Sequence, residues 1–86
     1  MTELNDLVET IETREDLVQF IEALLQDLTA HEDSWENPTL KRYLAALAAW
    51  TQDMEGYFQN IHRTSVPTEP SWKLIGYMLL AASIYE

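Results

Sequence analysis

The stretch that decides the fold is residues 71–85, which read SWKLIGYMLLAASIY. On a helix, its apolar residues fall on two opposite sides: Trp72, Ile75, Leu79 and Ala82 on one, and Leu74, Tyr77, Met78, Ala81 and Tyr85 on the other. A helix that is apolar on every face is buried or presents one face to a partner. We therefore predict a C-terminal helix that begins near Ser71 and occupies the centre of a small bundle.

The clearest amphipathic pattern lies over residues 14–30. Thr13 followed by Asp16 resembles a capping box, and acids in a first helical turn suit the helix dipole. One face is apolar and comprises Leu17, Val18, Phe20, Ile21, Leu24, Leu25 and Leu28. The opposite face carries no base and includes the acids Glu15, Asp16, Glu22 and Asp27. These features predict a helix that ends near Ala30.

A third helix is predicted over residues 38–55. Asn37 is a favoured N-cap residue, and Pro38 suits the first helical position. The apolar stripe consists of Leu40, Leu44, Leu47, Thr51, Met54 and Phe58. Its period continues through Gly56, so the helix either reaches about Asn60 or ends at this glycine. We expect it to end near Glu55 and to be followed by a looser turn.

The residues before the first long helix are less decisive. Leu4, Leu7, Val8 and Ile11 have helical spacing, but their β-branched members also suit a strand. We predict one all-α domain over residues 1–86, with three principal helices, a short N-terminal segment and the C-terminal helix at its centre. The predicted core includes Phe20, Leu24, Leu47, Trp72 and Leu79.

The charge of the chain is strongly negative and unevenly placed. The net charge is −10, and residues 1–36 hold eleven acids and one base, whereas residues 37–86 hold four of each. Phosphate contacts need a basic patch, so no binding to nucleic acid or to an anionic membrane is expected. A basic protein partner suits this charge, and acidity that only maintains solubility is the alternative. The oligomeric state is left open.

The sequence also suggests a cellular setting. The first twelve residues carry acids and no base, which is the reverse of a targeting peptide. The longest apolar stretch, residues 74–84, is too short to cross roughly 30 Å of hydrocarbon. With no Cys in the chain, disulfides and thiolate metal sites are excluded. We expect a cytoplasmic protein.

Candidate chemical groups are sparse. The densest set of potential metal ligands is in residues 31–36 and consists of His31, Glu32, Asp33 and Glu36. Their spacing matches no established metal site, so a solvated acidic connection is the favoured interpretation. His62 has no recognisable partner that would orient it as a general base. We predict no catalytic residue, no metal ion and no cofactor.

Two charged pairs lie on the third predicted helix. Asp53 and Glu55 could form a carboxylate pair for acid–base work, but two exposed acids on the polar side are the commoner arrangement. Lys41 and Arg42 lie in the first turn, where the helix dipole disfavours positive charge. We expect one of these bases to fold back onto the acids of residues 32–36 and to help seat Trp35.

The aromatic residues are the most informative about binding. Three Trp, four Tyr and two Phe exceed what so small a core requires, although they could all be buried. Trp35 lies in a polar connection and is expected to be half buried. Tyr and Trp are enriched at protein interfaces. The predicted partner-binding surface therefore combines Trp35 and Tyr57 with the acidic residues Glu15 and Glu22.

The pattern of aromatic residues and their neighbours also resembles a known family. It comprises Trp35-Glu36-Asn37, Leu44, Trp50, Asp53-Met54-Glu55-Gly56-Tyr57, Asn60, Pro67, Pro70-Ser71-Trp72, Ala81-Ala82 and Ile84-Tyr85-Glu86. This pattern is similar to that of a family of small uncharacterised bacterial proteins, cyanobacterial ones included, from about residue 13 to the end. Members more often have Tyr at Phe58 and a less hindered or acidic pair at Gly76-Tyr77. The resemblance implies a helical cytoplasmic protein and transfers no activity.

Three classes of function follow from these observations. A non-enzymatic protein-interaction module accounts best for the acidic asymmetry, the aromatic surplus and the lack of a chemical site. An inhibitor or immunity-like protein that blocks a basic surface is the first alternative, and it requires steep salt dependence. A metal-binding or enzymatic protein is the second, and it requires a pocket with convergent polar groups.

Overall fold

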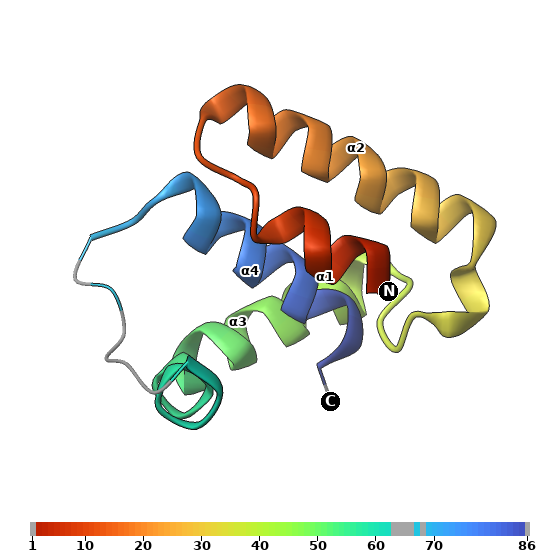
Figure 1. Ribbon diagram of the computed structural model, residues 1–86. Helices are drawn as coiled ribbons and strands as arrows, with labels where there is room; N and C mark the ends of the chain where they lie inside the picture. The colour runs from red at the N-terminus through yellow and green to blue at the C-terminus, as the bar shows by residue number, and fades with distance from the viewer. Residues whose placement is uncertain (1, 63–66, 68, 86) are drawn as a thin grey trace.

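The chain forms four α-helices in the part that the structure describes, which is residues 2–62, 67 and 69–85 of this computed structural model (Figure 1). They are α1 (Thr2–Val8), α2 (Arg14–Ala30), α3 (Leu40–Tyr57) and α4 (Trp72–Ile84). A 3₁₀ turn, η1 (Glu32–Ser34), follows α2, and a π-helical turn, η2 (Phe58–His62), extends α3. No strand occurs in these residues, so the all-α prediction is confirmed, and the ambiguous N-terminal segment is a helix.

Helix α4 lies at the centre of the bundle, as predicted. It packs against α1, α2 and α3, and α1 also packs against α2. Within the described residues, α2 and α3 do not approach each other closely. Figure 1 shows α2 and α3 on opposite sides of α4. The two longest helices are therefore joined through α4 and not through each other.

Local caps fix the starts of α2 and α4. The Thr13 hydroxyl accepts a hydrogen bond from the Asp16 amide (3.1 Å), and the Asp16 carboxylate accepts one from the Thr13 amide (3.2 Å). This is the predicted capping box, and the Asp16 carboxylate also accepts from the Glu12 amide. These backbone hydrogen bonds, that from Glu12 first, lower the pKa of Asp16. Helix α4 begins after Ser71, whose hydroxyl caps the Leu74 amide (3.0 Å).

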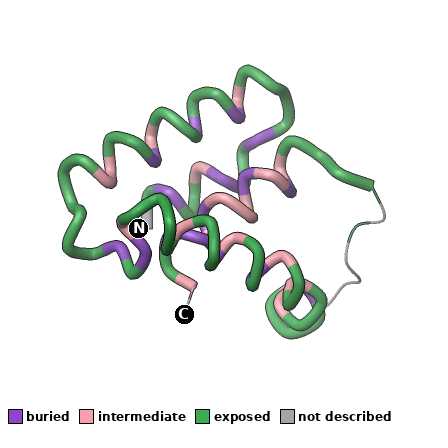
Figure 2. Tube along the Cα trace, turned by 180° about the vertical axis from the view of Figure 1, so that it is seen from behind, coloured by how far each residue is buried: buried purple, intermediate pink, exposed green. Residues whose placement is uncertain are grey.

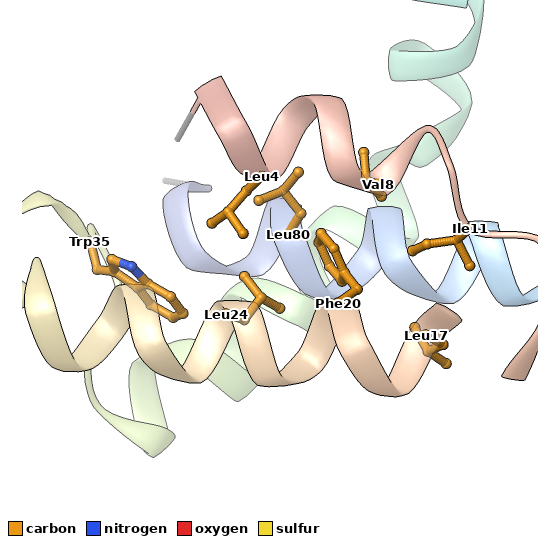
Figure 3. Close-up of a cluster of buried hydrophobic side chains, with 8 residues drawn as sticks. All are labelled: Leu4, Val8, Ile11, Leu17, Phe20, Leu24, Trp35 and Leu80. Carbon is orange, nitrogen blue, oxygen red and sulfur yellow. The ribbon is translucent and has the colours of Figure 1, made fainter. Parts of the chain in front are cut away.

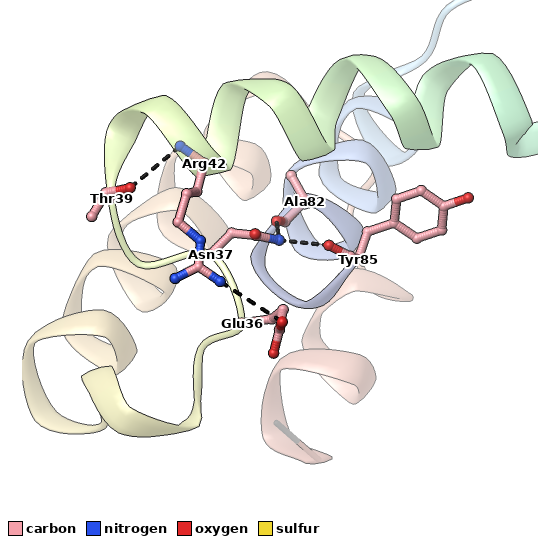
Figure 4. A network of polar contacts seen from close by, with 6 residues as sticks. All are labelled: Glu36, Asn37, Thr39, Arg42, Ala82 and Tyr85. Carbon is pink, nitrogen blue, oxygen red and sulfur yellow. Dashed lines mark hydrogen bonds and ion pairs between the residues drawn. The ribbon is translucent and has the colours of Figure 1, made fainter.

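The predicted start of α3 is wrong. Thr39 caps this helix by accepting from the Arg42 amide (3.3 Å), and the helix begins at Leu40. Asn37 is buried, and its side-chain Nδ2 donates to the carbonyl oxygens of Ala82 (3.0 Å) and Tyr85 (2.7 Å), as Figure 4 shows. The amide of Asn37 is thus used by the end of α4, where it satisfies carbonyl groups that lack helical donors.

The predicted end of α3 near Glu55 is also wrong. The helix passes through Gly56 to Tyr57 and continues into η2 without interruption. A glycine in a helix costs only about 1 kcal/mol relative to alanine. Packing offsets that cost, because the Tyr57 and Phe58 rings both lie about 6.1 Å from the ring of Tyr77 on α4.

The core has two clusters of buried side chains. The larger joins α1, α2 and α4 and consists of Leu4, Val8, Ile11, Leu17, Phe20, Leu24, Trp35 and Leu80 (Figure 3). The smaller joins the end of α3 to α4 and consists of Trp50, Phe58 and Leu74. The predicted burial of Phe20 and Leu24 is confirmed. Ile11 lies so close to Gly76 that a Cβ atom there would be 2.5 Å from its Cδ1.

The orientation of α4 differs from the predicted one. Trp72 is 42% exposed, and Leu79 and Leu47 are partly buried, so none of these three belongs to the fully buried core. The buried residues of α4 are Leu74, Gly76, Leu80, Ala82 and Ser83. Because α4 is apolar on all sides, its sequence pattern could not predict which side is buried most deeply.

Trp35 is buried and not half exposed as predicted. It is 7% exposed, and its Nε1 donates to Asp27 Oδ2 at 2.7 Å. Its ring also stacks on Tyr43, with the ring centroids 6.1 Å apart. A polar connection can thus place a tryptophan in the core when a neighbouring carboxylate satisfies the indole N–H.

One predicted ion pair is present beside this connection. Arg42 Nη2 lies 3.7 Å from Glu36 Oε1, and both side chains are about half exposed (54% and 47%) (Figure 4). Arg42 therefore does fold back onto the acidic connection. An ion pair this exposed contributes about 0–1 kcal/mol.

Candidate functional site

Two rows of exposed apolar side chains mark the candidate functional site. Val18, Ile21 and Leu25 on α2, and Leu40 and Leu44 on α3, are 44–73% exposed. Successive residues in each row are three or four positions apart, which places them on one side of the helix. Figure 2 shows that exposed residues occupy most of each turn of α2, with buried residues at intervals. Single exposed apolar residues are common, but two rows of them indicate a contact surface.

A groove of about 410 Å³ lies between these helices. Ile21 and Leu25 line its α2 side, and Leu40 lines its α3 side. Partly buried residues, among them Leu28, Tyr43 and Leu79, line it as well. The groove exists because α2 and α3 both pack on α4 and stay apart from each other. Leu79, predicted to be in the core, is one of the α4 residues that this arrangement leaves partly open.

The two sides of the groove carry different charges. Glu15 and Glu22 precede Val18 and Leu25 by three residues, so each carboxylate shares a helix side with an exposed apolar residue. On α3, Lys41 has the same relation to Leu44. The α2 side is therefore acidic, and the α3 side carries a base.

The predicted partner-binding residues do not form one surface. Glu15 and Glu22 are exposed on α2 beside the groove, and Arg14 lies 3.3 Å from the Glu15 carboxylate. Trp35 is buried, although it contributes to the lining of the groove. Tyr57 lies about 21 Å from Tyr43 along the axis of α3, at the rise of 1.5 Å per residue. The structure thus separates Tyr57 from the other three.

Tyr57 belongs to an aromatic group at the other end of α3. Its ring lies 5.3 Å from those of Trp50 and Phe58, and its hydroxyl is 3.1 Å from His62 Nε2. Burial, followed by the negative charge of Glu9, raises the pKa of Tyr57. His62, which had no predicted partner, is therefore held by a tyrosine.

The remaining chemical candidates are dispersed. Among the residues that the structure describes, no group of three or more His, Asp or Glu side chains could hold a metal ion. Asp53 accepts a hydrogen bond from the Tyr85 hydroxyl (2.5 Å), whereas Glu55 accepts one from Gln59 (3.3 Å). The two carboxylates thus have separate hydrogen-bond partners.

The width of the apolar face of α2 is a sequence signal for the groove. Seven apolar residues form the apolar face of α2, but only Leu17, Phe20 and Leu24 are buried. Helices α1 and α4, against which α2 packs, cover only part of this wide stripe. The excess width was the sign that part of the face remains uncovered.

These features define a small all-α protein with a central C-terminal helix and an open apolar groove. The profile of a family of unknown function, DUF7660, matches residues 13–86, and the chain belongs to this family. The match covers α2, α3 and α4 and begins after α1. Comparisons with curated proteins and with solved structures gave no match. In the described residues, no helix has both the length and the apolar character needed to cross a membrane.

Proposed function

We propose that this protein is a non-enzymatic protein-interaction module whose groove between α2 and α3 receives an amphipathic helix of a partner protein. The observation that carries the proposal is the pair of exposed apolar rows on the two sides of the groove. Grooves of this kind bind helices whose apolar residues recur at i, i+3, i+4 and i+7. The α2 lining of the groove runs from Ile21 to Leu28, about 10 Å along the helix axis, which matches two turns of a partner helix.

Charge favours a basic partner over a second copy of the chain. Two copies with a net charge of −10 each repel one another, whereas a basic helix is attracted to both the molecule and the α2 side. Because Lys41 lies on the opposite side, the bases of the partner belong next to Glu15 and Glu22. A bacterial, cytoplasmic setting is part of this proposal and rests on the family resemblance.

The acidic face of α2 also supports a second candidate, an inhibitor or immunity-like protein that blocks a basic surface. The two candidates differ in where the affinity arises. An inhibitor depends mainly on charge and loses affinity steeply with salt, whereas a groove binder depends on apolar contacts that salt does not screen.

The test uses two designed helical peptides with the same apolar face, one with lysines and one with glutamates on the side that faces α2. The lysine peptide is expected to bind and to shift the amide resonances of α2 and the first half of α3. Leu25→Ser should weaken binding at least tenfold, since it removes a large apolar side chain from the interface. Glu22→Lys should weaken it a few-fold, because this exposed carboxylate contributes about 0.2–1 kcal/mol.

Ile61→Ser is the matched control. Ile61 is 65% exposed, close to the 63% of Leu25, but it lies on η2 outside the groove. The free energy of unfolding of both serine variants should lie within about 0.5 kcal/mol of the wild-type value, as is usual for substitutions at exposed positions. Equal losses of peptide affinity in the two variants, or resonance shifts outside the groove, would refute the proposal.

A further inference from the structure

A second pocket, independent of the groove, lies between α1, the end of α3 and the second half of α4. Its volume is about 540 Å³, within the range of small-ligand sites. Aromatic and polar residues supply much of its lining, namely Asn5, Trp50, Asp53, Tyr57, Tyr77 and Tyr85. The proposed interaction with a partner helix does not use this pocket.

The aromatic rings of this pocket are inclined to one another. The rings of Trp50 and Tyr57 lie 5.3 Å apart with an angle of 62° between their planes. The rings of Tyr57 and Tyr77 lie 6.1 Å apart at 55°. Rings at such angles direct their faces in several directions around one space. Aromatic faces carry partial negative charge and attract cations within about 6 Å of the ring centre.

Two carboxylates flank these rings. Asp53 lines the pocket, and its Oδ2 accepts a hydrogen bond from the Tyr85 hydroxyl (2.5 Å). On the α1 side, the Glu9 carboxylate accepts a hydrogen bond from the Tyr77 hydroxyl. Among the described residues that line the pocket, none is basic. His62, whose Nε2 lies 3.1 Å from the Tyr57 hydroxyl, contacts the rings from outside this lining, and the acidic groups on both sides favour a cation and repel an anion.

The rest of the lining selects among cations. Leu80, Ala81 and Ile84 are apolar, so a bare ammonium group would lose hydration here. It would find few free acceptors in return, because the Tyr77 and Tyr85 hydroxyls are already hydrogen-bonded to carboxylates. An alkylated ammonium group has little need of hydrogen bonds and offers methyl groups to aromatic faces. Aromatic cages recognise quaternary ammonium and methylated lysine in this way.

We propose that this pocket binds an alkylated ammonium cation between the rings of Trp50, Tyr57 and Tyr77, with Asp53 as the neighbouring anion. The cation is either a free quaternary ammonium compound or a methylated lysine side chain of a protein. Both sources present the same charged group, and they differ in what is attached to it.

Choline and its neutral isostere, in which carbon replaces the nitrogen, provide the first test. The readout is the shift of the Trp50 indole and the amides of residues 53–57 in nuclear magnetic resonance spectra of the full chain. Choline should bind about 2- to 30-fold more tightly than the isostere, the range expected for one or more cation–π contacts. Equal affinity of the two compounds, or shifts elsewhere on the protein, would overturn the proposal.

Variants test the contributions of the Tyr57 ring and the Asp53 charge separately. Tyr57→Leu should abolish the preference for choline, whereas Tyr57→Phe keeps the ring and should retain it. Asp53→Asn should weaken the binding of choline and leave the binding of the isostere unchanged. Because Asp53 is exposed, this substitution does not alter the packing of the core. Asp33→Asn, an exposed change of the same kind on η1, is the matched control. Loss of choline binding in Asp33→Asn equal to that in Asp53→Asn would contradict a role for the pocket carboxylate.

A third arm identifies the source of the cation. Peptides that carry trimethyllysine or unmodified lysine are compared with choline in the same experiment. Tighter binding of the trimethyllysine peptide indicates a protein source, and tighter binding of choline indicates a free compound. Preference for unmodified lysine would refute the selection of alkylated cations.

Discussion

Asn37 provides the sharpest test of how this fold is held together. Its Nδ2 donates to the carbonyl oxygens of Ala82 and Tyr85, and its backbone amide donates to that of Ser83 (3.2 Å). The start of α3 is thereby tied to the end of α4. We predict that Asn37→Ala and Asn37→Asp both destabilise the protein, and that the aspartate is the worse of the two.

The magnitude follows from the partners that are lost. Two hydrogen bonds contribute about 0.5–1.5 kcal/mol each, and a buried carbonyl left unsatisfied costs about 1–3 kcal/mol. Asn37→Ala removes the bond to Tyr85 and leaves the buried Ala82 carbonyl unsatisfied, so it should cost about 1.5–4.5 kcal/mol. Asn37→Asp adds a negative charge at the negative end of the α4 dipole, which costs up to about 1–2 kcal/mol more. The whole chain is stabilised by about 4–13 kcal/mol at typical values per residue.

The effect of Asn37→Asp should depend on pH. The carboxylate faces carbonyl oxygens, so its pKa in the folded state should lie above the value of about 3.9 in the unfolded chain. The additional destabilisation is therefore present above the folded pKa. It decreases as the pH falls, because the protonated acid can donate a hydrogen bond to one of the carbonyls.

Urea unfolding followed by far-ultraviolet circular dichroism at about pH 7 and pH 4.5 measures these differences against the wild type at each pH. Asn60→Asp is the control, because it adds the same charge at an exposed position on η2. A loss below about 0.5 kcal/mol in both Asn37 variants at pH 7 would refute the reasoning. So would an aspartate effect that grows as the pH is lowered.

Three further predictions concern single contacts. Gly76→Ala should lower the free energy of unfolding in the wild type and lower it less in an Ile11→Ala background, because the added Cβ meets Ile11 Cδ1 at 2.5 Å in the wild type, whereas only the milder contact with Val8 Cγ2 at 3.2 Å remains once Ile11 is truncated. Urea midpoints that fall equally in both backgrounds would contradict this. Burial raises the pKa of Tyr43 to about 12 from 10.0, so the stability that depends on the neutral hydroxyl is complete below pH 10 and is lost as the pH rises through about 12. Tyr43→Phe should lower the free energy of unfolding by about 1 kcal/mol near neutral pH. Above pH 10, the free energies of unfolding of the variant and the wild type should become more alike. A difference that does not change with pH would show that the hydroxyl has the same pKa in the folded and unfolded states. Finally, a double-mutant cycle between Asp27→Ala and Trp35→Phe should give a coupling of about 1.5–3 kcal/mol, as expected for a hydrogen bond to a charged group at 2.7 Å, and additive effects would exclude this bond.

The parts of the fold that could be predicted are those whose partners are near in sequence. The capping box of Thr13 and Asp16 and the cap at Ser71 involve residues three apart, so the starts of α2 and α4 follow from local chemistry. Asn37 shows the limit of such reasoning. An asparagine before a proline suits an N-cap, but here its amide partners lie 45 and 48 residues away.

The candidate site was harder to predict for a related reason. Periodicity shows which residues share a helix side, but not which neighbour covers that side. On α2 the same stripe contains buried Leu24 and 63% exposed Leu25, and only the positions of α1 and α4, which cover Leu24, distinguish them. The exposure of the acidic residues Glu15 and Glu22 was predicted correctly. Charged side chains are rarely buried, so their exposure can be predicted without knowing which elements pack nearby.

The central position of α4 has a consequence for synthesis of the protein. Residues 1–71 are made before α4 exists, over about 4–14 s at usual translation rates. During that time, α3 has no other helix to pack against, because its contacts with helices other than η2 are with α4. The apolar face of α3, and the part of the α2 face that packs on α4, therefore remain open to chaperones or to other chains until residues 72–84 leave the ribosome. Folding of this bundle is thus delayed until after its last helix has been translated, and a nascent chain arrested before residue 72 should be captured as an unfolded protein.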